Sequence, residues 1–201
     1  MEKEKTSMPA PCGLRKAAIQ MKRNISILGA AMLSVAILFS SGCGTEAAST
    51  GSSARAEQGE KFPAFTTQDL AGNTVTEEIF ARKKVTVINI WGTFCPPCIG
   101  EMPELSEWAG SMPADVQLVG IVCDVGGAGD KETFDEARKI MQKAGGDFVN
   151  LIPNGEIMKY LEKVEAVPTT IFVDEKGRIL GEPVIGADVA QYKARVREYL
   201  Q

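Results

Sequence analysis

The sequence predicts one α/β domain with a mixed β-sheet, helices on both faces of that sheet and a β-hairpin extension at its N-terminal side. The runs 85–90 and 116–123 are almost continuously apolar, as strands covered on both faces are. Apolar residues recur at helical spacing over 134–144 and 189–200, and a pair of short strands joined by a turn is expected over 169–180. Strands and helices therefore alternate along the chain.

The first 43 residues are expected to combine an N-terminal extension, over residues 1–20, with an export signal. A basic pair at 22–23 precedes the uncharged apolar stretch 25–39, and small residues follow. Residues 41–43 resemble a bacterial lipobox, in which the signal is cut before a cysteine that becomes lipid-modified, here Cys43. The uncharged stretch 24–45 approaches the length of a tilted transmembrane helix, so an uncleaved anchor is the alternative. Both alternatives attach the chain to the outer face of the cell membrane.

Residues 44–58 predict a flexible tether, because they are rich in Ser, Ala, Thr and Gly. The folded domain is expected over 59–201. Residues 1–43 hold 6 of the 22 basic and 2 of the 26 acidic side chains, so the remaining chain carries 16 basic and 24 acidic side chains, a net charge of −8. Such a surface repels nucleic acid and anionic lipid headgroups, so neither is expected as a ligand.

The domain is expected to begin with a hairpin and a short helix. Residues 63–67 and Val75, joined across 71–73, predict the hairpin. Thr76 and the two glutamates after it have the cap and the acidic first turn of a helix. The strand 85–90 follows.

The later elements are predicted from turns and apolar stripes. The glycine-rich segment 126–129 is expected to be a flexible loop, because the G-K-[ST] of a phosphate-binding loop does not follow it. Residues 169–173, a turn at 175–177 and residues 178–180 predict an antiparallel hairpin before the last helix. The apolar stripes of the two long helices are expected to form core, and no cofactor is expected.

Two cysteines spaced C-x-x-C directly follow the strand 85–90. Residues 91–98 read Trp-Gly-Thr-Phe-Cys-Pro-Pro-Cys, and Pro96 suits the first position of a helix that is expected to run to about residue 108. A cysteine at a helix N-terminus faces unpaired backbone N–H groups and the positive end of the helix dipole, which stabilise its thiolate. We therefore expect Cys95 to be the nucleophile and Cys98 to attack the mixed disulfide that Cys95 forms with a substrate.

Other uses of the C-x-x-C motif fit the sequence less well. Haem attachment needs a histidine after the second cysteine, and the chain contains no histidine. A zinc site needs two further ligands, but Cys12, Cys43 and Cys123 are scattered singly, so no metal site is expected. Cys123 ends a strand predicted beside the active-site strand, and it is either a third redox thiol or a small buried residue.

Residues 91–103, which continue after the motif as Ile-Gly-Glu-Met-Pro, resemble the active site of the TlpA/ResA-like branch of the thioredoxin superfamily. The likeness extends to residues 167–174, Val-Pro-Thr-Thr-Ile-Phe-Val-Asp, and covers 62–201. It implies a thioredoxin-like fold in which Cys95 attacks and Cys98 resolves.

The residues that bind substrate are expected beside the two cysteines. The resemblance implies a cis bond between Val167 and Pro168, and the backbone before this bond can pair with an extended substrate segment. Trp91 completes the predicted substrate-binding set. Together with Phe94 it is also expected to pack over the thiols and shield them.

The sequence leaves the proton carrier open. Thioredoxin has a buried aspartate on the strand before its motif, and Asn89, which cannot carry a proton, stands at the matching position. Proton transfer then falls to water or to another acid. Glu101 is the nearest acid by sequence, three residues after Cys98 on the same helix. It is either a catalytic acid or a solvated carboxylate on the helix face.

These observations predict an exported, membrane-tethered thiol–disulfide oxidoreductase that reduces disulfides of exported proteins. Disulfides persist outside the cytosol, so a C-x-x-C pair there needs a source of electrons. The resemblance implies a CcdA/DsbD-type membrane electron donor, and cytochrome c maturation or support of methionine sulfoxide reductases as the process served. The alternative is a non-catalytic metallochaperone, as Sco-like copper carriers are, or a binding lipoprotein on the same scaffold.

Overall fold

A computed structural model describes residues 59–127 and 129–201. The predicted leader and tether, with Cys12 and Cys43, lie outside these residues. The described part contains no helix that is both long and apolar enough to cross a membrane. The elements in chain order are β1 (Thr66–Gln68), β2 (Thr74–Thr76), the 3-10 helix η1 (Glu77–Arg82), β3 (Val85–Trp91), α1 (Pro96–Ser111), β4 (Val116–Val122), α2 (Lys131–Ala144), β5 (Asn150–Leu151), α3 (Gly155–Leu161), β6 (Thr169–Asp174), β7 (Val184–Ile185) and α4 (Val189–Tyr199).

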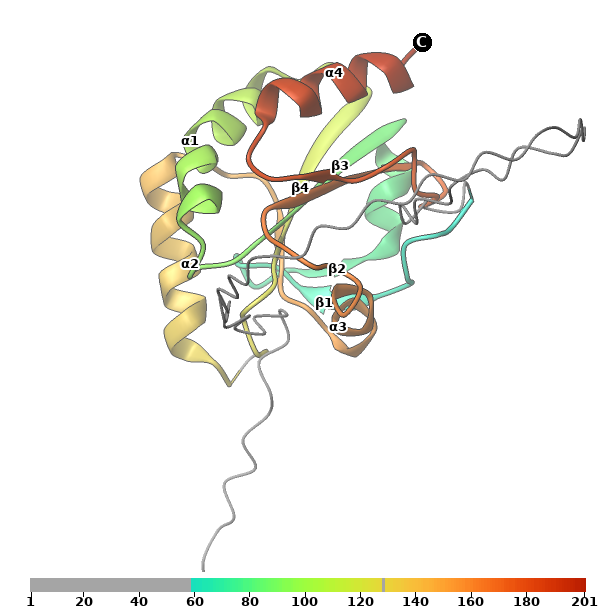
Figure 1. The fold of residues 1–201 in the computed structure, drawn as a ribbon. Helices are drawn as coiled ribbons and strands as arrows, with labels where there is room; N and C mark the ends of the chain where they lie inside the picture. The colour runs from blue at the N-terminus through green and yellow to red at the C-terminus, as the bar shows by residue number, and fades with distance from the viewer. Residues whose placement is uncertain (1–58, 128) are drawn as a thin grey trace, which may run out of the picture. The chain divides into compact units, whose positions relative to one another are not determined.

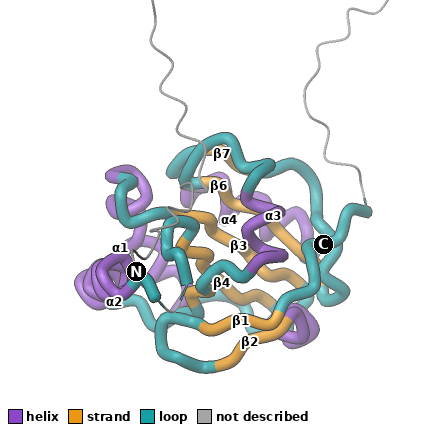
Figure 2. Tube along the Cα trace, turned by 90° about the horizontal axis from the view of Figure 1, so that it is seen from below, coloured by secondary structure: helices purple, strands orange, loops and turns teal. Residues whose placement is uncertain are grey.

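Five strands form the central sheet in the order β5-β4-β3-β6-β7. β4 runs parallel to β3 and β5, whereas β6 runs antiparallel to β3 and β7, so the sheet is mixed as predicted (Figure 1). Figure 2 shows β7, β6, β3 and β4 side by side in this order. β3 is the middle strand of the sheet, and all seven of its residues are buried. The segment that follows β3 therefore begins at the middle of one end of the sheet.

Side chains of the strands alternate between two hydrophobic clusters. On β3, Val87 and Trp91 belong to one cluster, whereas Ile88 and Ile90 belong to the other. The first cluster includes side chains of α1, α2 and α4, and the second includes side chains of η1 and α3. Helices therefore cover both faces of the sheet, which confirms the predicted fold class.

The N-terminal hairpin is present and covers one edge of the sheet. β1 and β2 pair antiparallel. The Leu70 N–H donates to the carbonyl of Asn150 at 2.9 Å, and the Ile152 N–H donates to the carbonyl of Gln68 at 2.8 Å. These bonds pair backbone groups beside β5 that an uncovered edge would leave open. The predicted cap at Thr76 is also present, although the helix after it is the short η1.

Some elements differ from the prediction. The second strand of the terminal hairpin is β7, and residues 178–180 contribute only single bridges, because the chain turns at Gly177 and again at Gly181, where φ is +73° and +61°. The sequence analysis missed β5 and α3, which are too short to show a clear period. α1 continues through Pro103 and ends at Ser111, three residues beyond the predicted end.

Candidate active site

The two cysteines of the motif form a disulfide at the start of α1. Cys95 is the N-cap of this helix, with φ −104° and ψ 99°, and Pro96 is its first residue. The Cys98 N–H donates to Sγ of Cys95 at 3.3 Å. The two Cα atoms are 5.3 Å apart. Because the Cys98 N–H and the positive end of the helix dipole face Sγ of Cys95, this position stabilises a thiolate once the disulfide is reduced.

The loop between β3 and α1 is fixed by an aspartate that the sequence analysis missed. The Thr93 N–H donates to both carboxylate oxygens of Asp124, at 3.1 and 3.0 Å, and the Thr93 hydroxyl donates to Oδ2 at 2.6 Å. Asp124 follows β4, the parallel neighbour of β3. Since parallel strands end at the same sheet edge, the position of Asp124 after a strand was the available signal.

The predicted substrate-binding loop lies against the disulfide. The bond between Val167 and Pro168 is cis, as the resemblance implied. Sγ of Cys95 lies 3.5 Å from the carbonyl oxygen of Val167. The Gly186 N–H donates to the carbonyl of Pro168 at 2.8 Å, which joins this loop to the end of β7. The structure therefore brings Val167, Pro168 and Cys95 together.

Glu101 is buried on α1, three residues after Cys98, and its side chain is only 6% exposed. The Asn89 Nδ2 group donates to Oε1 of Glu101 at 2.9 Å and to the hydroxyl of Thr170 at 3.0 Å. The hydroxyl oxygen of Tyr192 lies 3.1 Å from Oε2 of Glu101. Burial raises the pKa of Glu101 above its ordinary value of 4.5, and the hydrogen bond from Asn89 acts in the opposite direction. The alternative of a solvated carboxylate is therefore wrong.

Trp91 does not lie at the surface. Its side chain is 0% exposed, and its indole N–H donates to Oδ1 of Asn150 at 2.8 Å. The prediction that Trp91 contacts substrate is at odds with this burial, because the ring is enclosed by the core and its polar atom is already paired. Phe94, in contrast, is 45% exposed. Neither Asn150 nor the role of Tyr192 as a polar partner was evident in the sequence, where Tyr192 was part of an apolar stripe.

The remaining cysteines are separate from this pair. Cys123 is fully buried and belongs to the hydrophobic cluster on the face of the sheet opposite to the disulfide. Cys43, the predicted lipidation site, lies outside the described residues. Within residues 59–127 and 129–201, no group of three His, Cys, Asp or Glu side chains is arranged to hold a metal ion.

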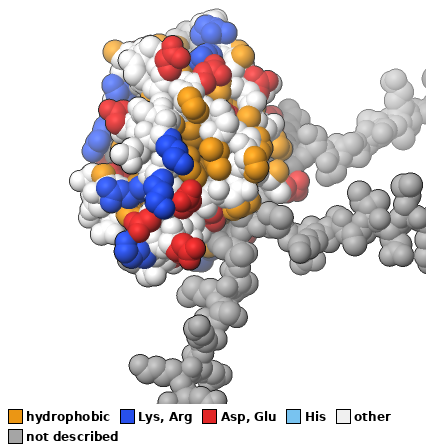
Figure 3. Space-filling model, turned by 90° about the vertical axis from the view of Figure 1, so that its left-hand side faces the viewer, with side chains coloured by type: hydrophobic (Ala, Val, Ile, Leu, Met, Phe, Trp, Pro, Cys, Tyr) orange, Lys and Arg blue, Asp and Glu red, His pale blue; other side chains and the backbone are white. Residues whose placement is uncertain are grey.

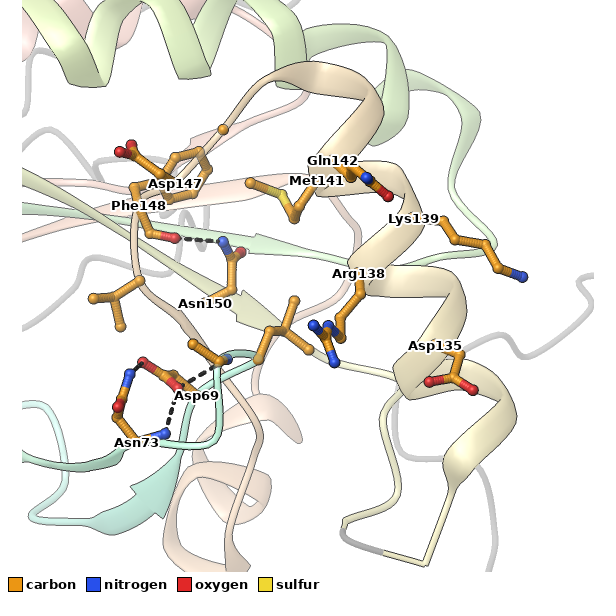
Figure 4. Close-up of a pocket in the computed structure, with 14 residues that line it drawn as sticks. Asp69, Asn73, Asp135, Arg138, Lys139, Met141, Gln142, Asp147, Phe148 and Asn150 are labelled. Atoms are coloured by element: carbon orange, nitrogen blue, oxygen red, sulfur yellow. Dashed lines mark hydrogen bonds between the residues drawn. The ribbon is translucent and has the colours of Figure 1, made fainter.

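The described domain has a cavity away from the disulfide. It has a volume of about 710 Å³ and lies between α2, the β1–β2 turn and residues 146–150 (Figure 4). Arg138 of α2 and Asp69 of the turn line it, together with Asn150. None of the predicted site residues lines this cavity, although Asn150, which does, accepts from the indole N–H of Trp91.

The sequence profile of the Redoxin family matches residues 57–193. The chain belongs to the Redoxin family. The relatives of this redoxin confirm the resemblance to TlpA/ResA-like proteins of the thioredoxin superfamily. This redoxin is 29% identical over 147 residues to the thiol-disulfide oxidoreductase ResA of Bacillus thuringiensis subsp. konkukian (strain 97-27). The match covers 72% of this chain and 78% of ResA. The chain is 30% identical over 129 residues to sporulation thiol-disulfide oxidoreductase A of Bacillus subtilis (strain 168), which covers 62% of this chain and 74% of that protein.

Solved structures show the same fold as this redoxin. StoA from Bacillus subtilis superposes with a TM-score of 0.54 at 20% identity, covering 70% of this chain and 98% of StoA. A secreted disulfide oxidoreductase of Mycobacterium tuberculosis superposes with a TM-score of 0.51 at 23% identity, covering 67% of this chain and 95% of that chain. The named relatives and the disulfide together identify the redoxin as an enzyme, a thiol–disulfide oxidoreductase.

Proposed function

We propose that this protein is an extracytoplasmic, membrane-tethered reductase that passes electrons from the Cys95–Cys98 dithiol to disulfides of exported proteins. One observation carries the proposal. Sγ of Cys95 is positioned at the N-terminus of α1, bonded to Cys98 and 3.5 Å from the carbonyl of Val167. A nucleophile, its resolving partner and a backbone group that can hold a client therefore share one site.

The reaction begins with the reduced chain. The Cys95 thiolate attacks one sulfur of a client disulfide, forms a mixed disulfide and expels the other client sulfur as a thiolate. The Cys98 thiol then loses its proton, and its thiolate attacks Sγ of Cys95. The second client sulfur leaves as a thiolate. Two electrons have passed to the client, and the Cys95–Cys98 disulfide remains.

Glu101 is proposed as the base that takes the proton from Cys98. The two side chains lie three residues apart on α1, so they share one helix face. Its raised pKa supports this role, because a carboxylate of higher pKa is a stronger base. When a donor later reduces the disulfide, Cys98 leaves as a thiolate and the same proton returns to it.

Clients are proposed to bind as extended segments beside Cys95. Val167 is only half-buried, and its carbonyl oxygen can accept from a client backbone. Phe94, Ile99 and Ile185 are the large hydrophobic side chains that the described domain exposes, at 45%, 38% and 66%. Phe94 precedes Cys95, and Ile185 pairs with the residue after Pro168. On the face that Figure 3 shows, hydrophobic side chains gather beside areas of mixed acidic and basic charge.

The location and the partners are proposed from the sequence. An export signal with a lipidated Cys43, or an uncleaved anchor, tethers the domain, and a CcdA/DsbD-like membrane protein supplies its electrons. Cytochrome c maturation or support of methionine sulfoxide reductases is the process served.

The activity is tested by reduction of insulin disulfides. The Cys95→Ala variant is expected to lose all turnover, because Cys98, the other thiol of the pair, is fully buried and cannot replace the nucleophile. Retained turnover would exclude the mechanism. A Lys143→Ala variant, which removes an exposed side chain from α2, is the matched control and should keep full turnover.

The client class is tested with a trap. Expressed in growing cells, the Cys98→Ser variant should accumulate mixed disulfides between Cys95 and exported proteins, which mass spectrometry identifies after purification. A Cys95→Ser/Cys98→Ser double variant is the control and should carry none. Adducts limited to cytosolic proteins would contradict the proposed location, and a trap without adducts would contradict the reductase role.

A further inference from the structure

The hydroxyl group of Tyr192 makes more contacts than its single proton can serve. Tyr192 belongs to α4 and is fully buried. Its oxygen lies 2.6 Å from the carbonyl oxygen of Gly186 and 3.1 Å from Oε2 of Glu101, and it accepts from the Asp188 N–H at 3.3 Å. A hydroxyl donates one proton, whereas a carbonyl and an ionised carboxylate both only accept. Two contacts between oxygens therefore need two protons.

The distances decide where the tyrosine proton lies. Two oxygens 2.6 Å apart with no proton between them repel each other, so the proton of Tyr192 is on the Gly186 side. A hydroxyl that donated to an ionised carboxylate would form a charge-assisted bond of about 2.5–2.7 Å. The observed 3.1 Å to Oε2 of Glu101 is longer than such a bond, so the proton of Tyr192 does not lie on this contact.

We infer that Tyr192 accepts a hydrogen bond from a protonated Glu101, and that this contact holds a proton beside Cys98 while the cysteines are oxidised. The inference deepens the proposed function and rests on the proton-transfer role given there to Glu101. Tyr192 is a positioning residue, because it acts through Glu101 and touches neither the sulfurs nor the client. The proton is the one that Cys98 gives up in client reduction and takes back when a donor thiolate breaks the disulfide.

The charges around Glu101 are consistent with a neutral acid. Tyr192 itself stays protonated, because burial raises its pKa to about 12. Glu104, one turn along α1, also favours the neutral form of Glu101 by repulsion, and it is paired with Lys193 of α4 at 2.9 Å. The strands supply only uncharged groups, and the disulfide does not titrate. These neighbours are Asn89 of β3 and Thr170 of β6, with Cys98 on α1 and Cys95 at its N-cap.

The test is a carboxyl ¹³C NMR titration of the oxidised full chain, purified in detergent, with the signal of Glu101 assigned through the Glu101→Gln variant. In the unmodified chain, Glu101 is expected to titrate above the exposed glutamates. In Tyr192→Phe, the pKa of Glu101 is expected to fall, with roughly fivefold weaker proton binding, the loss of one neutral hydrogen bond. If Tyr192 instead donates to a carboxylate, the same variant raises the pKa, which overturns the inference.

The matched control is Tyr199→Phe. Tyr199 lies on the same helix, and its buried hydroxyl has no hydrogen-bond partner within the described part of the chain. Its removal should leave the titration of Glu101 unchanged, and an equal shift in both variants would overturn the inference. If Tyr192→Phe does not fold, the unmodified chain still decides, because a Glu101 that titrates with the exposed glutamates contradicts it. Loss of turnover in Glu101→Gln tests the proposed function separately, since the titration needs no activity.

Discussion

The carboxyl group of Glu101 is buried, and burial favours its neutral form. Burial raises its pKa above 4.5, so the folded chain still binds a proton at pH values where the unfolded chain has lost it. The stability that this proton gives is fully present below pH 4.5 and is lost as the pH rises through the raised pKa of the folded state. Glu101 therefore lowers the free energy of unfolding at neutral pH.

Replacement of this carboxyl group by an amide gives the first prediction. Glu101→Gln is expected to raise the free energy of unfolding of the oxidised chain at pH 7, because the amide carries no charge to desolvate and can donate to Tyr192. At about pH 4 the variant and the unmodified chain should be equally stable. Urea denaturation at both pH values measures the difference. An exposed residue of the same helix supplies the control, Glu107→Gln, and a pH-independent effect of Glu101→Gln would contradict the argument.

Residue roles could be predicted where they depend on neighbours in sequence. Cys95, Cys98 and the Val167–Pro168 loop were found from local motifs, and all of them lie together. The burial of Glu101 could not be predicted, because it depends on Asn89 and Tyr192, which the fold brings from β3 and α4. The prediction that Trp91 contacts substrate failed for the same reason, because its hydrogen-bond partner Asn150 lies 59 positions away in the sequence.

At the scale of elements, Asn150 of β5 reaches Trp91 of β3 across β4, which lies between these two strands. Gly120 lies on β4 opposite β5, and a Cβ atom placed there would overlap the Asn150 amide and press on the Trp91 indole. The strand position therefore requires glycine for packing. Gly110, near the end of α1, is exposed and has open space where its Cβ would be.

The two glycines give the second prediction as a matched pair. Gly120→Ala is expected to lower the free energy of unfolding by about 1–3 kcal/mol, through overpacking and loss of the bond to the Trp91 indole. Gly110→Ala should raise it by about 0.5–1 kcal/mol, because alanine favours the helix. Chemical denaturation of both variants measures the two effects. Equal stability of the two variants would show that the close approach at Gly120 is not required.

Element prediction succeeded where a pattern was long. The seven-residue strands β3 and β4 are almost continuous apolar runs, and the helices α2 and α4 show clear helical periodicity. The structure contains all four within a few residues of the predicted ends. β7 has two residues, and Gly177 and Gly181 decide where it lies by turning the chain, which a pattern of apolar residues does not show. Pairing across the sheet, and not propensity, defines such short strands.

At the scale of the whole molecule, the sheet separates the hydrophobic cluster that holds the redox site from the cluster on the opposite face. The cluster with α1, α2 and α4 contains the disulfide, whereas the cluster with η1 and α3 contains Cys123. Side chains of β4 alternate between the faces, and Cys123 continues this alternation at the end of the strand. A thiol on the far face cannot reach the disulfide without opening the sheet.

This separation gives the third prediction. Cys123→Ala is expected to keep the insulin-reducing turnover of the unmodified chain, because the thiol lies across the sheet from Cys95. It should lower the free energy of unfolding by about 1 kcal/mol, since one buried atom is removed from a packed cluster. In the folded, reduced chain, iodoacetamide should modify Cys95 long before Cys123, which mass spectrometry of the digested protein measures. A Cys123→Ala variant that loses turnover while its free energy of unfolding stays unchanged would instead identify Cys123 as a third redox thiol. With stability unchanged, disturbed packing could not explain the lost turnover.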